Sequence, residues 1–79
     1  MEQRTYAVIE LVGVSEYTYD DAARCAIARA SETLDGLAWF KVRELRGSIR
    51  DGEVAEYQVS LELGFRLLRD GELQEQQPS

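Results

Sequence analysis

The chain has 79 residues and a net charge of −6, so it can form one domain at most. It has no histidine and one cysteine, which excludes a disulfide within the chain and a Cys/His metal cluster. An acidic chain also lacks the basic face that nucleic acids and anionic membranes require, so we expect neither as a partner. No apolar run is long enough to cross a bilayer and no secretory signal is visible, so the expected location is cytoplasmic.

The first expected element is a β-strand over residues 5–13, which are rich in β-branched and aromatic side chains. A helix should follow, because Thr18 and Asp21 have the spacing of a capping box. In that motif the Thr18 hydroxyl accepts a hydrogen bond from the Asp21 amide, and the Asp21 carboxylate reaches back to the helix start. Apolar positions then repeat every 3.6 residues as far as Leu34, and Gly36 is expected to end the helix.

Residues 37–67 predict one long β-hairpin. Asp51-Gly52 is typical of a type I′ turn, and the residues after it alternate between apolar and polar. The resulting register pairs Trp39 with Gly64 and Gln58 with Leu45. Residues 43–47 of the first arm break the alternation, which indicates a β-bulge there.

The order of elements predicts an α+β fold of the βαββ type, with a three-stranded antiparallel sheet in the order 1-3-2 wrapped on one helix. We divide the chain into a domain at residues 1–67 and a mobile polar tail at residues 68–79. Seven side chains are expected to face the helix: Phe40, Val42, Tyr57, Val59, Leu61, Leu63 and Phe65.

The hairpin is too long for one helix to cover. We therefore expect the uncovered apolar end, including Tyr57 and Val59, to be buried against another copy of the chain. On the opposite face of the sheet, the large indole of Trp39 lies beside the bare backbone of Gly64. This pairing predicts a flat aromatic shelf that is open to a ligand.

Five spaced motifs stand out in the chain: Ile9–Gly13, Asp20–Ala23, Trp39–Val42, Arg46-Gly47 and Ala55–Leu67. In this order, over about residues 5–67, they resemble the dodecin family. The resemblance implies a hollow homododecamer of βαββ subunits, with pairs of flavins held between tryptophans of two-fold-related subunits. It further implies that the protein stores or sequesters riboflavin, lumichrome or flavin mononucleotide (FMN), is not an enzyme, and has coenzyme A as a further expected ligand. The sequence departs from the family pattern at Tyr19, at Lys41 and in its longer tail.

Three residues are candidates for flavin binding: Trp39, Gln58 and Arg66. The electron-poor isoalloxazine ring gains from stacking on an indole, and a glutamine amide complements its pyrimidine edge. Trp39 and Gln58 are about 20 Å apart along the strands, so they can contact one flavin only from different subunits. For Arg66 two roles stay open, a contact to a ribityl phosphate or an ion pair.

Without histidine, and with no nucleophile spaced near a base, the sequence shows no catalytic set. Two other functions stay open. The chain could be a small regulatory or assembly module in which Trp39 is a protein-binding hot spot, or a carrier of coenzyme A or a nucleotide in which flavin is incidental.

Overall fold

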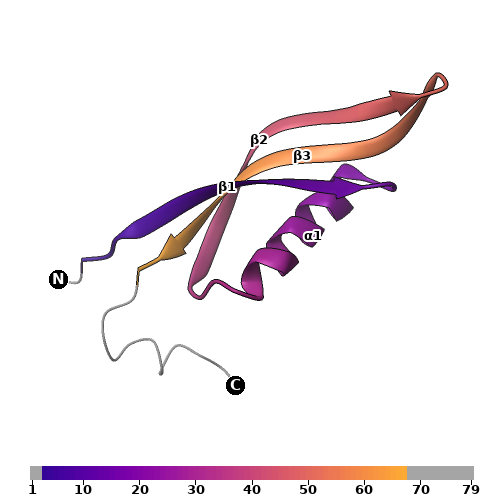
Figure 1. The fold of residues 1–79 in the computed structure, drawn as a ribbon. Coiled ribbons are helices and arrows are strands. Elements are labelled where there is room, and N and C mark those ends of the chain that lie inside the picture. Colours follow the sequence, from indigo (N-terminus) through magenta and orange to yellow (C-terminus); the bar gives the residue numbers. More distant parts are fainter. Residues whose placement is uncertain (1–2, 68–79) are drawn as a thin grey trace.

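The computed structural model describes residues 3–67, which form one three-stranded antiparallel sheet and one helix (Figure 1). The strand order is β1-β3-β2, so the predicted βαββ fold and strand order are confirmed. The predicted tail, residues 68–79, lies outside the described residues. Within residues 3–67, no helix has the length and apolar character needed to cross a membrane. The elements are β1 (Tyr6–Ser15), α1 (Tyr19–Ser31), β2 (Leu37–Arg50) and β3 (Glu53–Arg66).

The start of α1 differs in one hydrogen bond from the predicted capping box. Thr18 caps the helix as expected, since its hydroxyl accepts from the Asp21 amide at 2.9 Å. The Asp21 carboxylate, however, accepts a 2.8 Å hydrogen bond from the buried hydroxyl of Ser15 rather than reaching back to Thr18. Ser15 is in position because β1 continues two residues beyond its predicted end at Gly13.

The helix ends earlier than predicted, at Ser31 with Glu32 as its C-cap. One further turn follows, in which the Leu34 amide donates to the carbonyl of Ala30 at 3.0 Å. Gly36 has a left-handed φ of 76°, and its carbonyl accepts from the Arg66 amide at 2.9 Å. Gly36 therefore joins the chain to the end of β3 rather than ending the helix.

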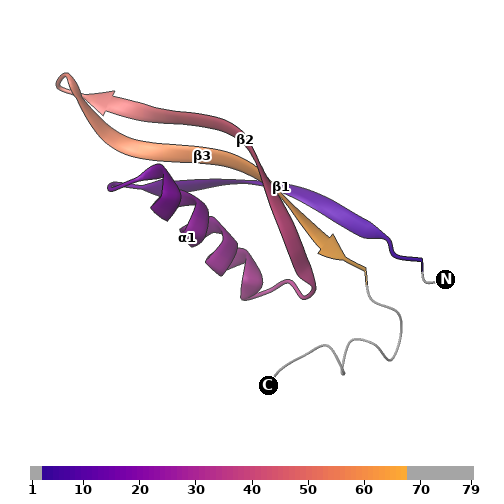
Figure 2. The ribbon, with the colours of Figure 1, turned by 180° about the vertical axis from the view of Figure 1, so that it is seen from behind.

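The core lies between α1 and the central strand. Val59, Leu61 and Leu63 of β3 are at most 1% exposed, which confirms the predicted inward face at these positions. The helix packs across β1 and β3, as the views from both sides show (Figures 1 and 2). Its approach is close, since a Cβ on Gly13 of β1 would collide with the carbonyl oxygen of Ala22.

The apolar surface that the helix leaves open lies on β2, and two predictions about it were wrong. Phe40 and Val42 were expected in the core, but they are 53% and 44% exposed because α1 covers β1 and β3 instead. Val59 was expected among the uncovered residues and is buried, while Tyr57 is half-buried with its ring edge-on to Tyr19 at 5.0 Å. The exposed apolar side chains of the hairpin's helix-facing side are Phe40, Val42, Leu45, Ile49 and Val54.

The hairpin itself has the predicted turn. Asp51 and Gly52 have φ angles of 54° and 79°, as a type I′ turn requires. Each arm has 14 residues, or about 47 Å, whereas the 13 residues of α1 span only about 20 Å. The predicted excess of hairpin over helix is therefore present, and Figure 1 shows the turn extending past the helix.

Two β-bulges modify the register between the turn and Trp39. Ala55 of β3 has no partner, which shifts the pairing by one so that Gln58 faces Arg46 instead of the predicted Leu45. Arg43 of β2 is the second unpaired residue, within the stretch where a bulge was predicted, and it shifts the pairing back. Because the two bulges cancel, Trp39 lies opposite Gly64 as predicted.

Candidate ligand site on the far face of the sheet

The sheet face opposite α1, called the far face below, carries Trp39 and Gly64 side by side. A Cβ built on Gly64 would collide with Cε2, Cζ2 and Nε1 of the Trp39 indole. The indole therefore lies over Gly64, in the place that a side chain at this position would occupy. Since Trp39 keeps 42% of its surface exposed, the indole is both fixed in place and available for stacking.

Next to this shelf, an arginine holds two opposed carboxylates. Glu10 of β1 and Glu62 of β3 are direct cross-strand partners, a placement in which like charges repel. The Nη1 atom of Arg43 lies 2.6 Å from Glu62 Oε2 and 3.1 Å from Glu10 Oε2. The hydrogen bond that Arg43 donates to Glu62, together with the charges of both carboxylates, raises the pKa of Arg43.

The amide of Gln58 is oriented by its own network. Arg46 Nε donates to Gln58 Oε1 at 3.1 Å, and Gln58 Nε2 donates to Glu56 Oε1 at 3.3 Å. Arg46 is itself held by Glu44, whose Oε1 accepts from Nη1 at 2.9 Å. Gln58 thus has a defined orientation on the far face, with one amide hydrogen and one carbonyl lone pair left over.

The structure brings together only part of the predicted site. Arg66 follows Gly64 by two residues on β3, so it lies about 7 Å from the shelf on the same face. Gln58 precedes Gly64 by six residues, or about 20 Å. A single chain therefore presents Trp39 and Arg66 near each other and keeps Gln58 apart from both.

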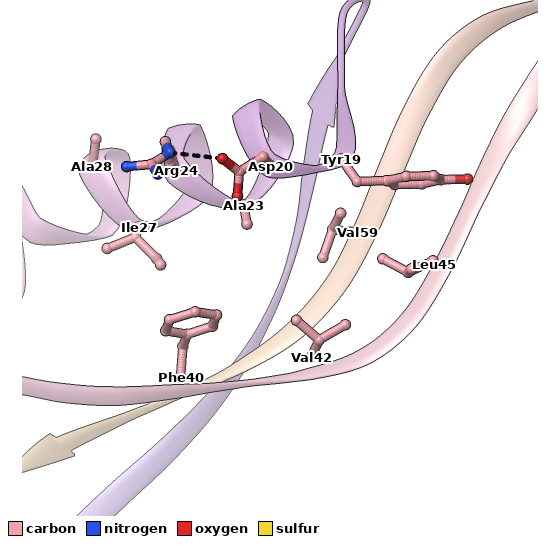
Figure 3. Close-up of a pocket in the computed structure, with 10 residues that line it drawn as sticks. All are labelled: Tyr19, Asp20, Ala23, Arg24, Ile27, Ala28, Phe40, Val42, Leu45 and Val59. Carbon is pink, nitrogen blue, oxygen red and sulfur yellow. Dashed lines mark hydrogen bonds and ion pairs between the residues drawn. The ribbon is translucent and has the colours of Figure 1, made fainter.

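On the helix side, an apolar groove of about 570 Å³ runs between α1 and β2 (Figure 3). Phe40 points across it from β2 toward Ile27 of the helix. Its charged members, Asp20 and Arg24, pair with each other at 3.2 Å along the exposed rim of the helix. The groove thus offers an apolar contact surface whose two charged side chains are paired with each other. Its lining residues are Tyr19, Asp20, Ala23, Arg24, Ile27, Ala28, Phe40, Val42, Leu45 and Val59.

Sequence reasoning missed the role of Arg43, which bridges all three strands. Finding it required the pairing of Glu10 with Glu62, and that pairing depends on the β1–β3 register, which no turn defines. The signal that was present in the sequence is the bulge, because an unpaired residue in a bulge often redirects a side chain.

Comparison with known proteins agrees with this architecture. The sequence model of the dodecin family matches residues 5–68. The chain belongs to the dodecin family. The curated dodecin of Thermus thermophilus is 52% identical to it over 64 residues, which cover 81% of this chain and 93% of that protein. The solved dodecin of Streptomyces coelicolor is also 52% identical and superposes with a TM-score of 0.84, covering 87% of this chain and 99% of the other.

A more distant solved relative is the calcium dodecin of Mycobacterium tuberculosis, which is described as calcium-chelating and as having a novel calcium-binding site. It is 28% identical to this dodecin, with a TM-score of 0.72 and coverage of 95% and 99% of the two chains. Among residues 3–67 of this dodecin, no group of three or more His, Cys, Asp or Glu side chains is arranged to hold a metal ion.

Proposed function

We propose that this dodecin binds a flavin, FMN or riboflavin, by stacking the isoalloxazine ring on Trp39, and that it stores the flavin without turning it over. The observation that carries the proposal is the indole lying over Gly64 with 42% of the Trp39 surface exposed. A flat, electron-poor ring stacked on such a fixed indole gains about 1 to 3 kcal/mol. The indole is already held in place, so ordering it costs the complex little.

Gln58 is the proposed partner of the flavin's pyrimidine edge. That edge alternates acceptor, donor and acceptor, and the amide hydrogen and lone pair that Gln58 has left over complement two neighbouring atoms of it. The distance of about 20 Å from Trp39 requires that the two residues come from different subunits. Arg66, near the shelf, is the proposed contact of a ribityl phosphate when FMN is the ligand.

An interface site needs an assembly, and the proposed one is the homododecamer that the family resemblance implies. It is supported by the apolar groove beside β2 and by the exposed side chains Phe40, Val42 and Leu45, which one chain cannot cover.

The proposed cytoplasmic location rests on the sequence, which has a single cysteine and therefore needs no oxidising compartment to form a disulfide within the chain.

Stacking also accounts for storage rather than catalysis. A photoexcited flavin is a strong oxidant, and an indole in contact with it donates an electron and takes it back before the flavin reacts elsewhere. Bound flavin should therefore be nearly non-fluorescent and bleach slowly.

The test is to titrate riboflavin and FMN into purified protein while recording flavin emission, using the unmutated chain and Trp39→Ala. We expect strong quenching in the unmutated protein and no binding by the variant, while light scattering shows the same assembly for both. Bright bound flavin would contradict stacking. Absence of any binding would favour a protein-assembly role for Trp39 instead.

A further inference from the structure

Lys41 is the only lysine of the chain, and it lies beside the proposed flavin shelf. It follows Trp39 by two residues on β2, so the two side chains leave the same face about 7 Å apart. Arg66 lies on the other side of the shelf, because β2 and β3 run antiparallel and Arg66 follows Gly64. The shelf thus has one cation at each end along the strand direction.

Lys41 has no ion-pair partner of its own among residues 3–67. Its cross-strand partner is Glu62, but the carboxylate of Glu62 is bound by Arg43 at 2.6 Å. Arg43 reaches it because the bulge in β2 turns this side chain toward the same column of residues. Among residues 3–67, Lys41 forms no ion pair and no side-chain hydrogen bond, whereas Arg43 and Arg46 on the same face are both engaged.

We infer that Lys41 recognises the phosphate of a phosphorylated flavin and makes the site prefer FMN to riboflavin. The inference rests on the proposed flavin function and adds a specificity residue to it. FMN differs from riboflavin only by the phosphate at the end of the ribityl chain, so an ammonium beside the stacked ring that no ion pair holds acts on one ligand and not on the other. Lysine suits this role as a mobile point charge on a flexible stem.

A lysine on an edge strand also prevents unwanted strand pairing, and β2 is an edge strand. If Lys41 only protects the edge, its replacement should change the assembly and should change the affinities for FMN and riboflavin by the same factor. The ratio of the two affinities therefore separates phosphate recognition from protection of the edge.

The experiment measures dissociation constants of FMN and riboflavin by fluorescence quenching for the unmutated protein, Lys41→Gln, Lys41→Arg and Arg50→Gln. Arg50→Gln is the matched control, because it removes the same charge from an exposed position at the hairpin turn. We expect Lys41→Gln to weaken FMN binding about threefold to tenfold, as for a partly exposed charged contact, and to leave riboflavin unchanged. Lys41→Arg should restore the preference, and Arg50→Gln should affect neither ligand.

Inorganic phosphate is a second probe, since it separates a general anion site from recognition of FMN. We expect it to compete with FMN and not with riboflavin, and the competition should disappear in Lys41→Gln. The FMN preference should also decrease as salt is added. An unchanged ratio of affinities in Lys41→Gln would overturn the inference and leave Arg66 as the phosphate contact. If the unmutated protein binds neither flavin, the proposed function fails and the role of Lys41 fails with it.

Discussion

At Gly64 the missing side chain is what makes room for the Trp39 ring. The atoms that a Cβ would strike, Cε2, Cζ2 and Nε1, belong to the indole itself rather than to a neighbouring loop that could move aside. The ring therefore occupies the space that a side chain at position 64 of β3 would need. The shelf is a property of two residues on two strands, and a change in either one removes it.

The first prediction is that Gly64→Ala will displace the indole and weaken flavin binding at least tenfold, although Trp39 is still present. The physical reason is the steric collision, because a stacked ligand requires the ring plane that only glycine permits. The measurement is flavin titration together with tryptophan emission. Ser60→Ala, on the same strand and face, is the control and should bind normally; equal affinity in both variants would show that the ring is not held by Gly64.

Gln58 contributes in a different way, through hydrogen bonds that its neighbours have already oriented. The second prediction is that Gln58→Ala will weaken flavin binding about tenfold, since one or two hydrogen bonds of 0.5 to 1.5 kcal/mol each are lost. Because stacking on Trp39 remains, the flavin that does bind should still be quenched. Comparison of emission at saturation for this variant and for the unmutated protein checks the point, and a bright complex would place Gln58 in the stacking geometry itself.

At the scale of elements, the sequence was sufficient for each strand and for the start of the helix. Alternation, the Asp51-Gly52 turn and the Thr18 cap are local signals, and each of these features is present in the structure. The strand register was harder to predict, because each unpaired residue shifts the pairing of all residues that lie further from the turn. The bulge at Ala55 is marked in the sequence only by the consecutive apolar residues Val54 and Ala55, which do not by themselves define an unpaired residue, so the pairing of Gln58 was predicted one position off. Trp39 was placed correctly because the second bulge, at Arg43, cancels the first.

Coverage of the sheet was the other feature that sequence could not supply. Phe40 and Val42 have the apolar character and the inward direction of core residues, and both do face the helix side. Whether a helix covers them depends on where α1 lies across the sheet, which follows from the close contact at Gly13 of β1. Periodicity identifies a face but does not say whether the same chain buries it.

The connection between β1 and α1 gives the third prediction. Thr18→Ala removes the hydroxyl that accepts from the Asp21 amide, and should destabilise the protein by about 1 kcal/mol per subunit. The expected readout is a decrease of a few degrees in the thermal midpoint. Thr33→Ala, an exposed position beyond the helix, is the control; equal midpoints for the two variants would contradict the role of the cap.

At the scale of the whole molecule, the chain buries only part of its apolar surface. Its central strand is buried, while β2 exposes its apolar side chains along most of its length. The groove between α1 and β2 has apolar walls from both elements, so another chain that enters it meets a continuous apolar surface. Such a surface on a small acidic domain supports the proposed contact between subunits.

The last prediction couples this surface to the ligand site on the opposite face. Val42→Asp places a charge in the groove, and burying that charge between subunits would cost several kcal/mol, so the assembly should dissociate. Light scattering should report a mass of one or two chains, whereas Gln3→Asp, which adds the same charge at an exposed position, should leave the full mass. The dissociated variant keeps Trp39, Gly64 and the whole far face of the sheet.

Flavin binding should nevertheless be lost in Val42→Asp, although the substituted residue lies on the other side of the sheet from the indole. The reason is distance, because Trp39 and Gln58 of one chain are about 20 Å apart and cannot contact one ring. Titration of riboflavin into the dissociated variant checks this, with the Gln3→Asp protein in parallel. Binding of undiminished affinity by isolated chains would mean that Trp39 alone holds the flavin, and that the subunit interface has no part in the site.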